Sequence, residues 1–422
     1  MNADYRNSRS PAAYNIALVH PFDIRGTKIG GLETYIRDFV TFCPEDTRVL
    51  FIGVDAVGDM KLGRIAETTF RGRRFDFMPI LHYPDERARE AARRLRDSIT
   101  AQFFGGLVRH FPTIARTLRQ RRCSVDLRRV EFAWLPALLR LPYVQMLHGE
   151  GVPQRPMDSL LRDYRFVHQF GERFAVATSR KFLCVNPLIT ERLRVTYKGH
   201  ADKIDTLWTW VNTGIFRPQP FCRPLHPFRV VFVGRFDEFK RPRLMFKALG
   251  RLRKKLGGDL EFHYIGTSDT ARFPEFAEIE DITVRHGFQD AQGVARIVAN
   301  AHAGILTSEF EGMPRCVLET LAIGRPVVAV HLPQLESVID NQTSGYLVPN
   351  ELPENDLLEA LTQRLIEVRN AIGEGRVDPA AVASKITPFT PDTQLARVYR
   401  LHHEIQRGDT PASGGRFVQS MG

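Results

Sequence analysis

Cysteine is scarce in this chain of 422 residues, and its spacing is irregular. The five cysteines are odd in number, are scattered and never form a C-x-x-C pair: Cys43, Cys123, Cys184, Cys222 and Cys316. This pattern argues against a disulfide framework or a zinc site. It favours reduced thiols in a cytoplasm.

Long apolar runs are also missing, although 43% of the residues are hydrophobic. No stretch approaches the roughly 20 apolar residues that would cross a bilayer. Residues 1–10 are polar and lack the apolar centre of an export signal, so we expect none. The length and the hydrophobic content exceed one ordinary core and suit two α/β domains.

Strand-like apolar runs alternate with helix-length segments, which predicts parallel sheets wrapped by helices. The runs are 15–20, 48–53, 75–80, 143–147, 182–185 and 204–207 in the first half, then 230–233, 260–265, 282–285, 303–307 and 326–330. The proline-rich stretch 217–227 is typical of a linker. We predict domains over residues 1–218 and 219–390, and over 391–422 a helix with a frayed tail.

Two glutamates, Glu311 and Glu319, flank a predicted helix start. The run 303–307 predicts a buried strand, Pro314 suits the first residue of a helix, and Gly324 suits its end. Glu311 then lies on the intervening loop, and Glu319 lies in the second turn. A helix start at the carboxyl end of a parallel strand suits a phosphate, and two nearby carboxylates could bracket a nucleotide sugar.

Solvated surface glutamates are common, so the pair alone does not favour a binding site over two ordinary surface residues. The segment from Gly234 to Lys240 shifts the balance, because it too follows an apolar run, residues 230–233. Arg235 and Lys240 could clamp a diphosphate from the opposite side.

An ordered set of motifs, spanning about residues 15–349, resembles glycosyltransferase family 4. The motifs are Gly30-Gly31-Leu32-Glu33, His148-Gly149, Trp210-Val211-Asn212-Thr213, Gly234-Arg235 with Lys240, and Glu311-Gly312-Met313-Pro314 through Glu319. The family more often has Phe-Gly in place of Met313-Pro314, glycine in place of Arg241, and a glycine pair where this chain has Pro333–Glu336. The chain is therefore identified as a divergent, bacterial-type member.

The resemblance implies an α/β protein of the GT-B fold, with two Rossmann-like domains facing each other across a cleft and a C-terminal helix that returns to the first domain. It implies a retaining hexosyltransferase that moves a sugar from a nucleotide-diphosphate donor to a hydroxyl acceptor. It also implies no dedicated metal and no cofactor beyond the donor substrate. We expect the acceptor to be a lipid-linked or polysaccharide precursor.

The resemblance also implies roles for single residues. Glu311 would orient the donor sugar, and His148 would touch it, so these two are the catalytic candidates. The donor-binding candidates are Gly31, Arg235, Lys240, Gly312, Met313, Val317, Leu318 and Glu319, and the acceptor-side candidates are Gly30 and Lys28.

Simpler explanations remain open for the first half. Gly30 and Gly31 would serve equally well in a tight turn without a ligand, and they do not supply the G-x-G-x-x-G of a dinucleotide site. A structural role is the commoner one for a histidine such as His148. A non-catalytic binding protein derived from the same fold would be expected to lose Glu311 or Lys240, and this chain keeps both.

Positive charge is concentrated in residues 61–130, which hold 17 Lys+Arg and 7 Asp+Glu, a net of +10 (17 − 7) out of +11 for the chain. Apolar residues (Phe103, Phe104, Leu107, Val108, Phe111, Ile114, Leu118) interleave there with Arg109, Arg116, Arg119, Arg121 and Arg122. This mixture predicts a helix lying on an anionic membrane surface, peripheral on the inner face of the cell membrane. Simple packing with a solvated basic side is the main alternative. Nucleic-acid binding is not expected, because a recognisable motif is missing.

Overall fold

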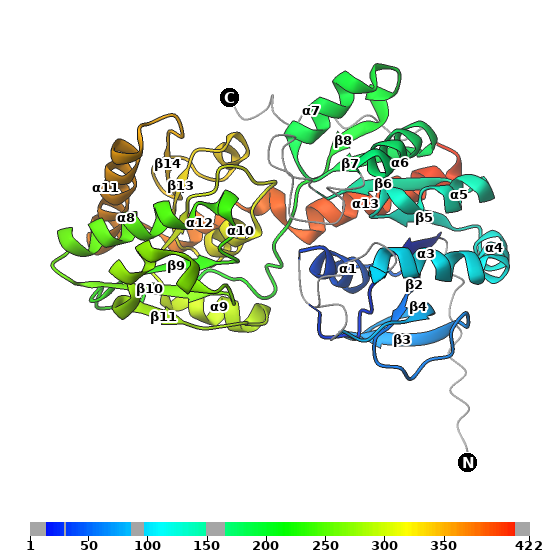
Figure 1. Ribbon diagram of the computed structural model, residues 1–422, viewed down its shortest axis with the longest axis horizontal. Helices are drawn as coiled ribbons and strands as arrows, with labels where there is room; N and C mark the ends of the chain where they lie inside the picture. Colours follow the sequence, from blue (N-terminus) through cyan, green and yellow to red (C-terminus); the bar gives the residue numbers. More distant parts are fainter. Residues whose placement is uncertain (1–13, 29–30, 86–96, 149–164, 410–422) are drawn as a thin grey trace, which may run out of the picture. The chain divides into compact units, whose positions relative to one another are not determined.

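The computed structural model describes residues 14–28, 31–85, 97–148 and 165–409. The chain divides into two compact units (Figure 1). The first unit comprises Met1–Leu207 and Leu395–Gly422, and the second comprises Trp208–Gln394. Each unit is a mainly parallel α/β sheet with helices between most of its strands, as the alternating pattern predicted.

The sheet of the first unit has the strand order β3-β4-β2-β1-β5-β6-β7-β8. Its strands are β1 Tyr14–Val19, β2 Thr47–Asp55, β3 Ala66–Phe70, β4 Arg73–His82, β5 Ser124–Leu127, β6 Tyr143–Leu147, β7 Lys181–Cys184 and β8 Ile204–Thr206. The neighbouring pairs are parallel, except that β3 runs antiparallel to β4. The helices are α1 Gly31–Thr41, α3 Ile99–Arg109, α4 Phe111–Gln120, α5 Trp134–Leu139, α6 Arg165–Thr178, α7 Pro187–Thr196 and α13 Pro391–Arg407.

The sheet of the second unit is parallel throughout and has the order β11-β10-β9-β12-β13-β14. Its strands are β9 Phe228–Val233, β10 Leu260–Ile265, β11 Thr283–Arg285, β12 Ala303–Leu306, β13 Val327–Val330 and β14 Gly345–Val348. Its helices are α8 Pro242–Lys255, α9 Ala291–Asn300, α10 Arg315–Ala322, α11 Glu354–Gly373 and α12 Pro379–Ser384. Helices α8 and α11 pack against each other on one side of this sheet (Figure 1).

Both sheets reverse their strand order beside the first strand of the unit. In the second unit, β10 and β11 extend the sheet on one side of β9, whereas β12, β13 and β14 extend it on the other. In the first unit, β1 lies in the same way between β2 and β5. In open α/β sheets ligands bind at such a switch point, outside the carboxyl ends of the strands.

The strand runs expected from the sequence all appear, with ends shifted by a few residues, but β3, β5 and β14 were missed. Strand β5 was missed because Ser124 and Asp126 make it polar, although both side chains are fully buried. Their partners come from the far end of the chain, since His402 lies 2.9 Å from Ser124 and 3.2 Å from Asp126. A hydropathy pattern cannot reveal a strand whose polar groups are satisfied by a distant helix.

Helix α13 begins in the second unit and ends in the first. Its predicted inner face is buried, with Leu395, Val398, Tyr399 and His402 at most 2% exposed. The hydroxyl of Tyr399 donates to the backbone carbonyl of Phe39 in α1. These contacts join the last helix to the sheet formed by the beginning of the chain.

The stretch 217–227, which its composition predicted to be a linker, lies inside the second unit. The guanidinium of Arg325 donates to the carbonyls of Gln219 (2.6 Å) and Pro220 (2.8 Å) and stacks on the ring of Phe221. The units therefore divide after Leu207 instead of after residue 218, and α13 joins the first unit from Leu395 on instead of from residue 391.

The basic amphipathic segment forms two helices, α3 and α4, separated by His110. Phe103, Leu107, Ile114 and Leu118 are fully buried in the core of the first unit. This packing, which was the alternative to a membrane-facing helix, accounts for most of the apolar residues of the segment. Phe104 and Val108 remain 41% and 53% exposed.

Candidate functional site

Loops at the carboxyl edge of the second sheet carry the candidate residues. Residues 234–241 follow β9, residues 307–314 follow β12, and residues 331–337 follow β13. Because these neighbouring strands are parallel, their loops emerge at the same edge of the sheet, beside the switch point between β9 and β12. The first loop leaves β9 through Gly234, whose φ of 141° strains any residue with a Cβ.

Lys240 and Glu311 join the first two loops. The ammonium nitrogen of Lys240 lies 2.6 Å from Oε1 of Glu311, and the side chains are only 14% and 15% exposed. The hydroxyl of Ser308 donates to the same carboxylate oxygen at 3.0 Å. Burial opposes the charged form of Lys240, but attraction and hydrogen bonding to Glu311 outweigh it and raise the pKa of Lys240. The ammonium is therefore held charged at neutral pH.

Backbone contacts hold the same two loops together. The hydroxyl of Thr307 donates to the carbonyl of Lys240 at 2.7 Å, and the N–H of Glu309 donates to the carbonyl of Phe239 at 2.8 Å. The ring of Phe239 also lies 4.9 Å from that of Phe310, centroid to centroid. Lys240 and Glu311 therefore meet on a braced scaffold.

Arg241 explains one departure from the family pattern. It has φ 47° and ψ 56°, the left-handed region, directly before α8 begins at Pro242. Glycine adopts this conformation without strain, which accounts for the glycine that the family more often has here. In this chain the Arg241 side chain donates from Nε to the carbonyl of Thr307 at 2.8 Å. The arginine thus adds a further tie between the loops.

Helix α10 begins beside Glu311. Pro314 is its N-cap and the helix starts at Arg315, one residue later than predicted, while Gly324 follows its end with φ 84° as expected. No side chain caps the start. The N–H groups of Arg315 and Cys316 donate to no acceptor in the part of the chain that the structure describes. The first turn therefore offers donors to an anion.

The remaining candidates on this segment differ in accessibility. Glu319 lies in the second turn, as predicted, 3.4 Å from the guanidinium of Arg315. Met313, Val317 and Leu318 are at most 4% exposed and belong to the hydrophobic core. Any contact that these three residues make with the donor substrate would have to come from their backbone atoms.

Gln334 is a site residue that the sequence did not single out. Its amide nitrogen donates to the carbonyls of Glu311 at 2.9 Å and Gly312 at 2.7 Å, which fixes the loop that carries Glu311. The available signal was its position just after the apolar run 326–330, at the same sheet edge.

Arg235 lies on the β9 loop, but no described contact joins it to Lys240 or Glu311. Its side chain is 68% exposed, and its guanidinium lies 2.9 Å from the carboxylate of Asp237. Packing therefore does not fix the Arg235 side chain in one position.

The candidates of the first half lie in the other unit. His148 follows β6, with its ring edge-on to Tyr35 and a centroid distance of 5.4 Å. Burial, with a smaller effect of Arg128, lowers the pKa of His148 to about 3. Lys28 pairs with Glu33 at 2.8 Å, and Gly31 is the first residue of α1. Gly30 and Gly149 lie outside the described residues.

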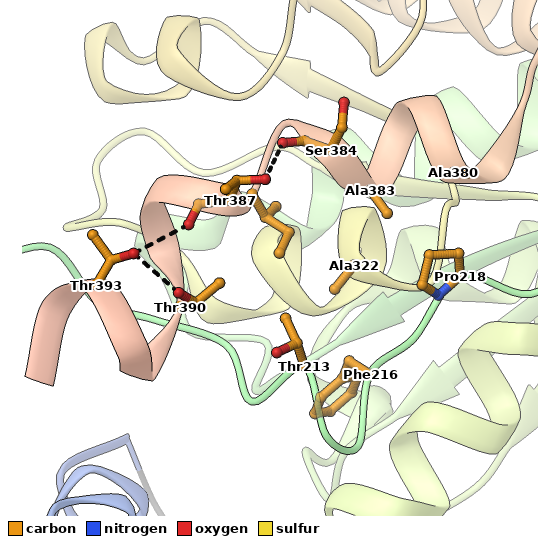
Figure 2. Close-up of a pocket in the computed structure, with 11 residues that line it drawn as sticks. Thr213, Phe216, Pro218, Ala322, Ala380, Ala383, Ser384, Thr387, Thr390 and Thr393 are labelled. Carbon is orange, nitrogen blue, oxygen red and sulfur yellow. Dashed lines mark hydrogen bonds between the residues drawn. The ribbon is translucent and has the colours of Figure 1, made fainter. Parts of the chain in front are cut away.

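A hollow of about 340 Å³ opens elsewhere in the second unit (Figure 2). Threonines such as Thr213, Thr387 and Thr390 line it together with small apolar side chains such as Ala322 and Ala383. It contains none of the predicted site residues. Within the described residues, no group of three or more His, Cys, Asp or Glu side chains could hold a metal ion.

The two parallel α/β units define a protein of the GT-B fold, as predicted. Residues 227–367, most of the second unit, match the family model described as Glycosyl transferases group 1. The match covers the β9 loop, the Lys240–Glu311 pair and α10. It agrees with the two sequence motifs of that unit, whereas Gly30–Glu33, His148-Gly149 and Trp210–Thr213 lie outside the matched residues.

Curated relatives are similar over part of the chain. A D-inositol 3-phosphate glycosyltransferase of Paenarthrobacter aurescens (strain TC1) is 27% identical over 221 residues, which is 49% of this chain and 54% of the relative. A putative colanic acid biosynthesis glycosyltransferase, WcaL, of Escherichia coli (strain K12) is 28% identical over 174 residues, 39% of this chain and 41% of the relative. The chain thus spans about half the length of the curated relatives it matches.

Solved structures extend the likeness in fold to nearly the whole chain. The sucrose-phosphate synthase (tll1590) from Thermosynechococcus elongatus superposes with a TM-score of 0.66, over 94% of this chain and 100% of the other, at 16% identity. Likeness at this identity shows the fold alone.

Proposed function

We propose that the protein is a glycosyltransferase that uses a nucleotide-diphosphate sugar as donor. The observation that carries the proposal is the Lys240–Glu311 pair at 2.6 Å, held at the switch point of the second sheet beside the uncapped start of α10. A fixed cation, backbone donors and a carboxylate at one sheet edge suit a diphosphate joined to a sugar.

In this mechanism the positive groups stabilise the leaving diphosphate. Lys240, held charged by Glu311, and the first-turn N–H groups of α10 bind the phosphates, and the exposed Arg235 swings in to complete the set. These groups oppose the negative charge that grows as the sugar–phosphate bond breaks, so we propose no dedicated metal.

The carboxylates bind the hydroxyl groups of the donor. Glu319 accepts from the ribose, and Glu311 orients the transferred sugar. The acceptor hydroxyl attacks the anomeric carbon on the face that the diphosphate leaves, and the diphosphate takes the acceptor proton. The configuration at that carbon is retained.

A thermal-shift panel tests the donor site. UDP, GDP or ADP, with or without the attached sugar, should raise the melting temperature by mass action, and the base that does so defines the donor. Lys240→Met should abolish the shift. The matched control is Lys247→Met, which removes an exposed lysine that also lies 2.6 Å from a glutamate, Glu354, and this variant should respond as wild type does. A wild-type shift in Lys240→Met would overturn the proposal, and binding without transfer would favour a non-catalytic protein.

We propose further that the acceptor is a lipid-linked or polysaccharide precursor and that the first unit docks peripherally on an anionic membrane. Phe104 and Val108 project from α3, the ring of Phe104 lies 5.3 Å from that of Trp134, and Leu138 on α5 is 63% exposed. Exposed arginines on the same helices, such as Arg116, supply positive charge. No helix in the described residues is long and apolar enough to span a bilayer.

Co-sedimentation with liposomes tests the docking. The wild-type chain should sediment with phosphatidylserine vesicles at low salt and remain in solution with phosphatidylcholine vesicles. Substitution of Phe104 and Val108 by serine should weaken sedimentation several-fold without a loss of fold, because both side chains face outward. Equal sedimentation with and without the substitutions would exclude this surface.

A further inference from the structure

Polar side chains gather at the carboxyl edge of the first sheet, at its own switch point. His20 follows β1, Arg128 and Arg129 follow β5, and His148 follows β6. Strand β5 is hydrogen-bonded to both β1 and β6, and all three run parallel. The residues that follow them therefore emerge side by side.

Each of these side chains has a buried nitrogen with no hydrogen-bond partner among the described residues: Nδ1 of His20, Nη2 of Arg128, Nε of Arg129 and Nε2 of His148. His20 and Arg128 are each only 3% exposed. Buried polar atoms are nearly always satisfied, so several unsatisfied nitrogens at one edge indicate a missing acceptor.

The charge of this cluster is positive and incompletely balanced. Arg128 lies 2.6 Å from Asp126, and Lys28 lies 2.8 Å from Glu33, so both have carboxylate partners. No carboxylate pairs with Arg129 in the part of the chain that the structure describes. Burial lowers the pKa of His20, and the positive charge of Arg129, Lys28, His148 and Arg128 lowers it further.

Arg128 acts as the scaffold of the cluster. Besides its ion pair with Asp126, its guanidinium lies over the ring of Tyr35, 3.7 Å from the centroid. Asp126 is also held by His402 of α13, at 3.2 Å. Among the described residues Arg129 has no comparable ion pair, which makes it the member of the cluster that we assign to a ligand.

We propose that this edge of the first unit binds a phosphate group carried by the acceptor, with Arg129 supplying the charge and His20 and His148 donating hydrogen bonds. The assignment of this phosphate to the acceptor rests on the function proposed above, whereas the anion site itself rests on the cluster alone. A tetrahedral phosphate can accept from donors on three converging strand ends at once, which a planar carboxylate does less well. The chemistry covers phosphate monoesters, diesters and diphosphates.

Titration calorimetry with inorganic phosphate, at constant ionic strength and on the full chain, tests the site. Arg129→Gln should weaken phosphate binding about tenfold or more, because it removes a charge-assisted contact. The matched control is Arg180→Gln, an exposed arginine directly before β7 in the same unit, which should bind phosphate as wild type does. Unchanged affinity in Arg129→Gln would overturn the inference.

Arg129→Lys separates a binding role from a structural one. It keeps the charge and should stay within about threefold of wild type, whereas an equal tenfold loss in both Arg129 variants would indicate a role in folding and overturn the site. Acetate serves as a second probe, and binding as tight as that of phosphate would overturn the assignment to phosphate.

Lys240→Met distinguishes this site from the donor site. It should abolish binding of the nucleoside diphosphate while leaving the Arg129-dependent phosphate binding intact. If Lys240→Met weakened phosphate binding and Arg129→Gln did not, the anion would lie in the second unit. This inference would then be wrong, and the proposed function would still stand. If no nucleoside diphosphate bound but the Arg129-dependent phosphate site persisted, the proposed function would fail and the anion site would stand.

Discussion

The ammonium of Lys240 and the carboxylate of Glu311 lie 2.6 Å apart, although 71 residues separate them in the chain. Each stands on the loop that follows one of two adjacent parallel strands, β9 and β12. Because both side chains are largely shielded from water, removing one partner leaves the other charge poorly compensated. The pair therefore links the architecture of the sheet to the chemistry proposed for its edge.

Glu311→Ala should lower kcat at least about a hundredfold, the usual order for loss of a group that acts on the transition state. The fold should be retained, as judged by circular dichroism. The matched control is Glu354→Ala, which removes an exposed carboxylate that also pairs with a lysine, and it should keep wild-type turnover. Turnover near wild type in Glu311→Ala would contradict the assignment.

Arg235→Ala should weaken binding of the nucleoside diphosphate about tenfold, because it removes one charge-assisted contact to phosphate. The unliganded protein should keep its stability, since this side chain is 68% exposed and pairs only with neighbouring Asp237 among the described residues. Calorimetry gives the first quantity and urea unfolding the second. A large loss of stability with unchanged affinity would reverse the interpretation.

Arg241→Ala should destabilise the second unit by about 1–2 kcal/mol, because the hydrogen bond to the Thr307 carbonyl is lost and the left-handed backbone remains. Arg241→Gly loses the same bond but relieves the backbone, so it should be about 1 kcal/mol more stable than the alanine variant. Urea midpoints of the two variants give this difference. An alanine variant as stable as the glycine variant would argue against strain at φ 47°.

Arg325→Met should cost about 3–5 kcal/mol, because a fully buried guanidinium donates to five backbone carbonyls, including those of Gln219 and Pro220. Arg325→Lys should recover little, since an ammonium cannot reproduce the planar fork. Arg376→Met, at a side chain that is 62% exposed, is the control and should change stability by less than about 0.5 kcal/mol. A mild effect of Arg325→Met would mean that residues 217–227 hold their place without it.

The stability of the second unit should fall as the pH drops from about 6.5 to about 4. His302 is fully buried, its Nδ1 accepts from the N–H of Arg229 at 2.9 Å, and burial lowers its pKa to about 4. In this window the His302 ring binds a proton in the unfolded chain but stays neutral in the folded one. The free energy of unfolding therefore falls by about 3 kcal/mol and levels off below pH 4. Unfolding by urea across this range should show a clearly smaller slope in His302→Gln than in wild type.

His331→Gln provides the matched control for that experiment. The His331 ring is 34% exposed and contacts the carboxylate of Glu336, so its replacement should leave the slope as in wild type. A slope as steep in His302→Gln as in wild type would assign the acid sensitivity to other groups.

Several strands that the sequence located are continuous apolar runs buried along their whole length, such as β12 Ala303–Leu306 and β13 Val327–Val330. Strand β5 lacks that property, because Ser124 and Asp126 are satisfied by His402, which lies more than 270 residues away. The prediction for residues 217–227 was wrong for the opposite reason. Their prolines and polar groups predicted a linker, but contacts with distant residues hold them in the second unit, among them those of the buried Arg325 and a hydrogen bond from Arg223 to the carbonyl of Ile372 at 2.7 Å.

The sequence by itself determined the alternation of strands and helices, the placement of Glu311 and Lys240 just after buried strands, and the start and stop of α10, because apolar periodicity, proline and glycine act over a few residues. Tertiary structure alone decided that Lys240 pairs with Glu311, that Gln334 braces their loop, and that basic groups of three strands gather unsatisfied at the edge of the first sheet. Those contacts depend on strand order, which joins segments far apart in the chain and leaves no local mark in it.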